Sequence, residues 1–301
     1  MNNANQHQRL VEIFRRHARK MQPLPADQSA KLQKLDGIRA VAFDVYGTLA
    51  ISSSGDIGLT SRDDKASAIE WAALETGIIA APNGIGKTGA RYYEEEVRAA
   101  QDRRRAEGID YPEVEIREVW RAVFQRLHQD GLCESRLDIN AIEMFGALFE
   151  CRMNPTCAMP GLRETLAQLH ARGLPLGIVS NAQYYTPPML EYELRQSHLD
   201  AGFDERLCVW SFDARIGKPS VALYETFATR LRTRCALEPE QCLFVGNDML
   251  KDIWAASQAG FHIALFAGDA RSLRLRPNDA RCRELQPDIV ITELRQLLQV
   301  V

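Results

Sequence analysis

The spacing of apolar residues divides the chain into a helical block and a block in which helices alternate with short apolar runs. From about residue 63 to residue 157 the apolar positions recur with helical spacing, and no strand is expected there. Turn signals at Pro82-Asn83-Gly84 and from Gly108 to Pro112 separate the helices. These helices are predicted at residues 63–76, 87–107, 113–129 and 138–152.

The second block begins after Pro160-Gly161. Helices are predicted at 161–172, 219–234 and 250–259, and apolar runs lie at 174–179, 207–210, 242–245, 262–266 and 289–291. Residues 40–43 form a similar run that stops at an Asp and a Gly-Thr turn. Short apolar runs that are separated by helices indicate a parallel sheet covered on both faces. The predicted fold is α/β: a doubly wound, Rossmann-like parallel sheet, interrupted after its first strand by an all-helical cap.

This pattern gives a division of the chain into an arm, a core and a cap. Residues 1–36 are polar and contain the break Pro-Leu-Pro-Ala-Asp, so they are predicted to be an N-terminal arm. Residues 37–51 and 159–301 are assigned to the core, and residues 52–158 to the cap, with a flexible connector at 52–58. Residues 8–21 suit a short basic amphipathic helix. We favour a helix docked on the protein over a membrane-surface or targeting segment, because the apolar residues are few.

Composition and charge exclude several classes of function. The net charge of −3 and the isoelectric point near 6.1 give no basic field for nucleic acid. No apolar run approaches the roughly 20 residues that span a bilayer, so no membrane partner is expected. The seven cysteines contain no C-x-x-C pair, which argues against a zinc or redox motif and for a reducing, cytoplasmic location.

Polar side chains follow four of the predicted strands at the point where each run ends. They are Asp44, then Ser180 with Asn181, then Lys218 in the loop after the third run, and then Asp248 with Asp252. Each one alone has an ordinary explanation as a turn residue, a helix cap or a solvated charge. All of them together, at the carboxyl ends of strands in one sheet, indicate a single site, because open parallel sheets bind their ligands at that edge.

These segments resemble the motifs of the haloacid dehalogenase-like hydrolases. Residues 44–49, Asp-Val-Tyr-Gly-Thr-Leu, resemble the family's nucleophile motif D-x-[D/Y]-G-T-[L/V]. Ser180-Asn181 resembles the second motif and Lys218 the third. Residues 246–252, Gly-Asn-Asp-Met-Leu-Lys-Asp, resemble the acidic fourth motif G-D-x-x-x-D, with one additional Asn between the Gly and the first Asp.

The resemblance implies a role for each of these residues. Asp44 is the covalent nucleophile, and the sequence predicts a Mg²⁺ cofactor held directly by Asp44 and Asp248 and partly through water by Asp252. The backbone carbonyl of Tyr46 is a further metal ligand. Lys218 neutralises Asp44 and the transferring group. The remaining candidate catalytic residues, which hold the equatorial oxygens with nearby backbone N–H groups, are Thr48, Ser180 and Asn181.

Tyr46 departs from the phosphatase pattern of the family. Phosphatases usually carry a second Asp there, which protonates the leaving oxygen, whereas the dehalogenase branch carries Tyr. Asp248 and Asp252 point the other way, because a metal-free enzyme that attacks carbon has little use for carboxylates beside its nucleophile. We therefore favour a Mg²⁺-dependent phosphatase. The alternative is a 2-haloacid dehalogenase that uses Asp44 without metal. A non-catalytic member or a binding module is less favoured, because the motif residues all remain.

The cap is expected to select a small anionic substrate, in a monomer or a homodimer. Its basic stretch, residues 98–105, either meets this substrate or forms a solvated helix face; we favour the solvated face, paired with the glutamates at 94–96. Four aromatic residues are assigned to the cap interior: Trp71, Tyr92, Tyr93 and Trp120.

Overall fold

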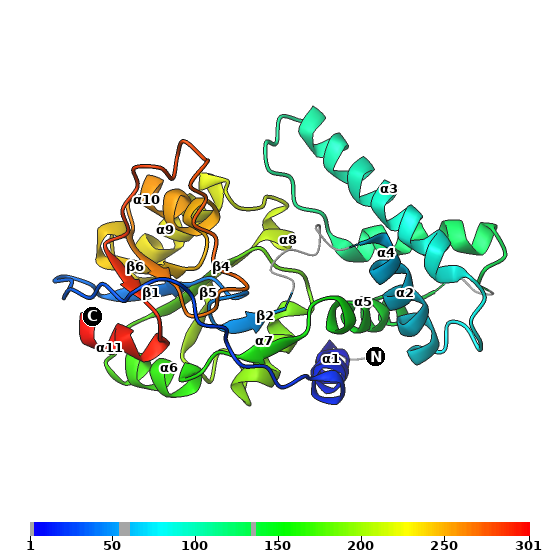
Figure 1. The fold of residues 1–301 in the computed structure, drawn as a ribbon, viewed down its shortest axis with the longest axis horizontal. Coiled ribbons are helices and arrows are strands. Elements are labelled where there is room, and N and C mark those ends of the chain that lie inside the picture. The colour runs from blue at the N-terminus through cyan, green and yellow to red at the C-terminus, as the bar shows by residue number, and fades with distance from the viewer. Residues whose placement is uncertain (1–2, 54–60, 134–136) are drawn as a thin grey trace.

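The computed structural model describes residues 3–53, 61–133 and 137–301, and Figure 1 shows a sheet with its helices beside a second group of helices. The sheet has six parallel strands in the order β5-β4-β1-β6-β7-β8. Their bounds are β1 Ala40–Phe43, β4 Leu176–Ser180, β5 Phe203–Trp210, β6 Cys242–Gly246, β7 His262–Phe266 and β8 Ile289–Ile291. The predicted doubly wound parallel sheet is confirmed.

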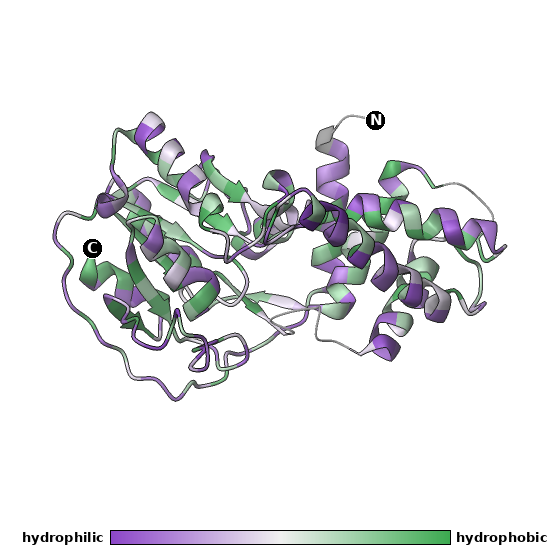
Figure 2. Cartoon of the chain, turned by 90° about the horizontal axis from the view of Figure 1, so that it is seen from above, coloured by the Kyte–Doolittle hydropathy of each residue, from purple (hydrophilic) through white to green (hydrophobic). Residues whose placement is uncertain are grey.

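Successive residues of the central strand face opposite sides of the sheet. Val41 and Phe43 pack into one apolar cluster, whereas Ala40 and Ala42 pack into the other. Figure 2 shows these strands in green between helices with mixed surfaces. The helices that cover the sheet are α6 Leu162–Ala171, α7 Thr186–Leu194, α9 Val221–Cys235, α10 Ala255–Gln258 and α11 Leu297–Val300. Both faces of the sheet are covered, so the central strands β4, β1 and β6 are buried along their whole length, whereas β5 at the edge carries exposed charged residues in its first half.

The strand order places the chemistry at the middle of the sheet. From β1 the chain adds β4 and β5 on one side, and later β6, β7 and β8 on the other. The ends of β4, β1 and β6 therefore meet at the point where the direction of winding changes, which is where open α/β sheets bind ligands.

Four helices form the second group, which we call the cap helices: α2 Arg62–Glu75, α3 Ile85–Ala106, α4 Ile116–Gln129 and α5 Ile139–Met153. Three of them begin at side-chain caps, in which Ser61 accepts from the Asp64 N–H, Glu115 from the Arg117 N–H and Asp138 from the Ala141 N–H. The buried ring of Trp120 lies between Tyr93, Phe145 and Phe149. The predicted helices agree with these within three residues at each end.

A two-stranded antiparallel ribbon joins the cap helices to the sheet. It pairs β2 Ala50–Ser52 with β3 Thr156–Ala158. The prediction of no strand between residues 63 and 157 is wrong for β3, because three residues are too few to show a period. The connector predicted at 52–58 lies outside the described residues from residue 54 onward. The division at residues 52 and 158 falls inside the ribbon and stays a proposal.

The N-terminal arm packs across the protein. Helix α1, Asn3–His17, lies against α5 and α7, with Leu10 and Phe14 buried. The side chain of Gln6 donates to the Asn140 carbonyl of α5. The docked helix is therefore confirmed, although it ends at His17 and not at residue 21. In the described ranges, no helix combines the length and apolar character needed to cross a membrane.

Candidate active site

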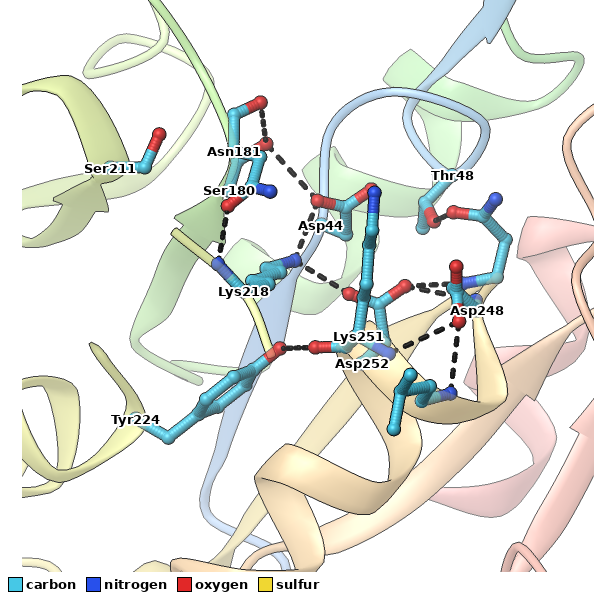
Figure 3. Close-up of polar contacts among 12 residues, drawn as sticks. Asp44, Thr48, Ser180, Asn181, Ser211, Lys218, Tyr224, Asp248, Lys251 and Asp252 are labelled. Carbon is cyan, nitrogen blue, oxygen red and sulfur yellow. Dashed lines mark hydrogen bonds and ion pairs between the residues drawn. The ribbon is translucent and has the colours of Figure 1, made fainter. Parts of the chain in front are cut away.

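Asp44 lies directly after β1 and is held by side chains from two other loops (Figure 3). Its Oδ1 accepts a hydrogen bond from the Ser180 hydroxyl (3.1 Å) and a charged hydrogen bond from Lys218 Nζ (2.7 Å). The backbone N–H of Asp44 donates to the Val245 carbonyl of β6, which fixes the start of the loop. The structure thus brings together three residues that the sequence predicted from separate motifs.

Lys218 bridges two carboxylates at the base of the site. Its Nζ lies 2.7 Å from Asp44 and 2.6 Å from Asp252, and all three side chains are buried. Burial by itself lowers the pKa of Lys218, but the two carboxylates outweigh it and leave this pKa above its usual value. The side-chain oxygen of Asn181 accepts from the Lys218 N–H (2.7 Å), so Asn181 positions the lysine. Lys218 is a fixed buried cation next to Asp44.

Both carboxyl oxygens of Asp252 accept hydrogen bonds from neighbouring groups. Its second oxygen, Oδ2, accepts the backbone N–H groups of Asn247 and Asp248, each at 3.0 Å. Burial raises the pKa of Asp252 to about 6, and the nearby charge of Lys218 opposes this rise. Gly246 makes room for the carboxyl group, because a Cβ there would lie 2.4 Å from Asp252 Cβ. In this arrangement Asp252 orders Lys218 and the loop after β6.

The turn behind Asp44 requires glycine for two reasons. Gly47 has φ +86°, and a Cβ at this position would lie 2.4 Å from Ser272 Cβ and 2.6 Å from the Asn247 amide. The Thr48 hydroxyl donates to the Asn247 side-chain oxygen (3.1 Å). Thr48 therefore ties the first motif to the fourth.

The fourth motif contains a π-helix. Helix η3, Met249–Trp254, begins after Asp248, and the Ile253 N–H donates to the Asp248 carbonyl five residues earlier. A π turn accommodates an additional residue in a helix and is frequent at functional sites. Asp248 forms a two-pronged ion pair with Arg276, with Nη2–Oδ2 2.6 Å. Burial by itself raises the pKa of Asp248, but Arg276 and two backbone N–H groups outweigh burial and leave this pKa below its usual value.

The carboxylate oxygens of the site are of the kind that a hard divalent cation binds, but they are not arranged around one common point. Asp44, Asp248 and Asp252 are buried together, with Lys218 and Arg276 as their cationic partners. Three carboxylates against two cations leave negative charge that a metal ion can balance. Within the described residues, no three acidic, His or Cys side chains are already arranged around one point. The residues therefore fit Mg²⁺ by their chemistry, and Arg276 is the group that holds Asp248 in its place.

Tyr46 lines the same cavity as Asp44, and its hydroxyl reaches the first residue of α7. Its hydroxyl shares a hydrogen bond with that of Thr186 (3.0 Å). Burial, reinforced by the charge of Glu150, raises the pKa of Tyr46 well above its usual value. The phenol stays neutral and is a poor proton donor at neutral pH.

A cavity of about 990 Å³ lies above Asp44, between the strand ends and the cap helices. The Gly217 N–H, next to Lys218, donates to the Tyr111 carbonyl in the loop between α3 and α4. The cavity walls carry charged side chains from both sides: Lys65, Glu94, Arg98, Asp102, Arg105, Glu113, Glu150, Lys251, Arg274 and Arg276.

This lining bears on two predictions about the cap. Arg98 and Arg105 are exposed, as a solvated helix face predicts, and they also line the cavity. The predicted pairing of residues 98–105 with the glutamates at 94–96 is wrong: Glu94 pairs with Arg62 and Lys65, and the other two glutamates pair with Arg126. Tyr93 stacks on Trp120, as expected of cap interior, but it also lines the cavity.

Glu150 is a site residue that the sequence did not reveal. It lies near the end of α5, is 3% exposed and lines the cavity. Asn154 Nδ2 donates to its Oε1 (3.0 Å), and the Tyr185 hydroxyl donates to its Oε2 (2.9 Å). Burial raises the pKa of Glu150 to about 7, although these hydrogen bonds favour the ionised form. In the sequence, Glu150 stands out only as a charged residue in a largely apolar helix, and it is part of none of the four motifs.

Ionisation of Glu150 is expected to destabilise the fold as pH rises. In the unfolded chain this carboxyl loses its proton near pH 4.5, whereas in the folded protein it keeps it to about pH 7. The folded state thus binds more protons between these values, so its stability falls as pH rises through this window, by on the order of 3 kcal/mol. Because glutamine does not ionise, the Glu150→Gln variant does not lose this stability as pH rises. The melting temperature of the variant relative to wild type should therefore increase from pH 5 to pH 8; a constant difference would contradict the assignment.

Comparisons with known proteins agree with this geometry. The family model of the haloacid dehalogenase-like hydrolases matches residues 38–260. A phosphoglycolate phosphatase of Salmonella paratyphi A is 29% identical over 236 residues, covering 76% of this chain and 81% of the relative. The Escherichia coli phosphoglycolate phosphatase is 28% identical over 235 residues, with the same coverage.

Among solved structures, a 2-haloacid dehalogenase from Pseudomonas syringae pv. Tomato superposes with a TM-score of 0.55 at 20% identity, covering 87% of this chain and 97% of that one. This similarity supports the fold. The family match spans strands β1, β4, β5 and β6 and the four motif loops. The chain therefore belongs to the haloacid dehalogenase-like hydrolases and is a hydrolase.

Proposed function

We propose that the protein is a Mg²⁺-dependent phosphatase that hydrolyses a small phosphorylated metabolite through a phosphoryl group carried on Asp44. The observation that carries the proposal is the cluster of three buried carboxylates, Asp44, Asp248 and Asp252, held by Lys218 and Arg276. Two curated relatives that match 76% of this chain are phosphoglycolate phosphatases. The large, charged cavity suits a phosphate ester that carries a second polar group.

The proposed reaction has two displacements at phosphorus. An oxygen of Asp44 attacks the phosphorus, the bond from phosphorus to the ester oxygen breaks, and the released alcohol takes up a proton. Water then attacks the phosphorus, which frees inorganic phosphate and restores the carboxylate. Lys218, 2.7 Å from Asp44, offsets the repulsion between nucleophile and phosphate. The Ser180 hydroxyl, which lies 3.1 Å from Asp44 Oδ1, and the N–H groups of the loop after Asp44 would hold the equatorial oxygens.

The metal site is part of the proposal. Asp44, Asp248 and the Tyr46 carbonyl would hold the ion, with Asp252 ordering the loop beneath. Bound Mg²⁺ supplies positive charge that stabilises the transferring phosphoryl group. Because Arg276 is paired with Asp248, we expect the ion and the guanidinium to compete for this carboxylate.

Added Mg²⁺ is expected to stabilise the wild-type protein by mass action. A ligand at about 100 times its Kd stabilises the folded state by about 2.7 kcal/mol. In Asp248→Asn most of this increment should disappear, because a charged ligand is lost. The measurement is the melting temperature with and without Mg²⁺. The matched control is Asp279→Asn. This variant removes a carboxylate that is paired with Arg281 in the loop between β7 and β8. Equal Mg²⁺ responses in wild type and Asp248→Asn would count against the metal site.

Tyr46 keeps one second candidate function open. A dehalogenase needs no proton for its leaving halide, so the neutral phenol of Tyr46 suits that reaction. In this alternative Asp44 attacks the carbon that bears the halogen and releases halide without metal. Halide release from a 2-haloacid that persists in excess chelator, with no turnover of phosphate esters, would favour it.

A further inference from the structure

The proposed phosphatase lacks a proton donor at the position where its family usually has one. The ester oxygen leaves as an alkoxide unless a nearby acid protonates it. Tyr46 stands at this position, but its hydroxyl is bonded to Thr186 and its pKa is raised well above the usual value. Another group must supply the proton, if ordinary alkyl phosphates are substrates.

The carboxyl group of Glu150 lies on the wall of the same cavity as Asp44. The charges of Glu150 and Asp44 both act on the Tyr46 phenol, so this ring lies within electrostatic range of both carboxylates. Glu150 also belongs to the cap side of the cavity, on α5, whereas Asp44 belongs to the sheet side. A substrate whose phosphate lies at Asp44 would extend its leaving group into this cavity, whose wall includes Glu150.

Hydrogen bonds fix Glu150 relative to both parts of the molecule. The Ser52 hydroxyl of β2 donates to the Asn154 side-chain oxygen (2.8 Å), and the Asn154 amide donates to Glu150. Tyr185, at the start of α7, donates to the other carboxyl oxygen. The carboxyl is thus tied to the ribbon and to the loop after β4, which keeps its place relative to Asp44.

We propose that Glu150 is the general acid that protonates the leaving oxygen, in place of the Asp that the family carries at position 46. This proposal rests on the proposed phosphatase function. As the bond from Asp44 to phosphorus forms, the ester oxygen leaves with its electron pair and takes the proton of Glu150. In the second displacement the Glu150 carboxylate takes a proton from the attacking water, so its starting state returns and the protons balance.

The surroundings of Glu150 raise its pKa, so that the acid form and the carboxylate are both populated near neutral pH. Its pKa of about 7 leaves a large fraction of the acid form at neutral pH. The titratable groups that face it are the phenols and the thiol of Tyr46, Tyr93, Tyr184, Tyr185 and Cys151. The pKa of every one is raised, first of all by burial, so these groups are neutral near pH 7 and do not compete as acids.

The test is the dependence of kcat/KM on leaving-group pKa, measured over a series from aryl to alkyl phosphates with Mg²⁺ present. Glu150→Gln keeps the shape of the side chain and removes the acid. We expect alkyl phosphates to be hydrolysed about 10²- to 10⁴-fold more slowly, and aryl phosphates with good leaving groups at nearly the wild-type rate. Adding Tyr46→Asp to Glu150→Gln should restore the alkyl substrates, because it returns an acid to the family's position.

Glu193 provides a matched control. It is also a buried glutamate beside the ribbon, bonded to Thr156 and to the Ala158 N–H, but it does not line the cavity around Asp44. Glu193→Gln should leave the leaving-group slope unchanged. An unchanged slope in Glu150→Gln, or an equal loss on all substrates, would overturn the proposal. Failure of the phosphatase proposal itself gives a different result: the wild type then turns over none of the esters, or Asp44→Asn turns over all of them like wild type.

Discussion

Asp44→Asn is expected to lower kcat/KM for phosphate esters by about 10⁴-fold or more while the fold survives. The amide keeps the size of the carboxyl group but cannot act as the nucleophile. The Ser180 hydroxyl and Lys218 can still donate to the amide oxygen, so the loop geometry is retained. The measurements are steady-state hydrolysis of an aryl phosphate and thermal unfolding of the same samples.

Asp213→Asn is the control for this variant. Asp213 is exposed, on the short helix α8, Ser211–Ala214, and it does not line the cavity. The Asp213→Asn variant should hydrolyse the ester at the wild-type rate. A folded Asp44→Asn protein that retains activity within tenfold of wild type would show that another group is the nucleophile.

Lys218→Met is expected to damage both stability and activity. The lysine neutralises Asp44 and Asp252 in a buried setting, with Nζ–O distances of 2.7 and 2.6 Å. Removal of one partner of a buried ion pair typically destabilises a protein by about 3–5 kcal/mol, because the remaining charge has no counterion. Activity should fall by orders of magnitude as well, since the cation that directly contacts Asp44 and offsets its repulsion of the phosphate is lost. Urea unfolding measures the free energy, and ester hydrolysis the activity.

A second substitution separates the two effects. In Lys218→Met with Asp252→Asn, one of the two unpaired charges is removed, so part of the unfolding free energy should return by coupling between contacting residues. Activity should not return, because the cation beside Asp44 is still missing. If Lys218→Met changed the unfolding free energy by less than about 1 kcal/mol, the ion pairs of Lys218 with Asp44 and Asp252 would contribute little to stability. That result would contradict the structural role proposed for Lys218.

The sheet and much of its site could be predicted because their signals are local. Apolar runs such as residues 242–245 and 262–266 correspond to β6 and β7 almost residue for residue. Asp44 and Ser180 lie at the ends of such runs, Lys218 lies in the loop that follows one, and parallel strands bring their carboxyl ends to one edge. Prediction of the site therefore needed only the position of each residue after its strand, and the hydrogen bonds of Asp44 agree with it.

The remaining features depend on contacts that have no local pattern. Arg276 reaches Asp248 across 28 residues of chain, from a loop without a motif. Glu150 interrupts an apolar helix and becomes significant only when Tyr185 packs against it. The direction of the Tyr46 side chain is set by Thr186, 140 residues away. Strand β3 is only three residues long, so its pairing with β2 is visible only in the fold.

The covalent intermediate is the most direct test of the proposed function. Wild-type protein with Mg²⁺ is mixed with an aryl phosphate, quenched in acid within its first turnover, and digested for mass spectrometry. We predict a phosphoryl adduct on the peptide that contains Asp44, present during turnover, lost on treatment with hydroxylamine, and missing from Asp44→Asn. Turnover of the ester with no adduct on this peptide, or with an adduct on another residue, would contradict the account.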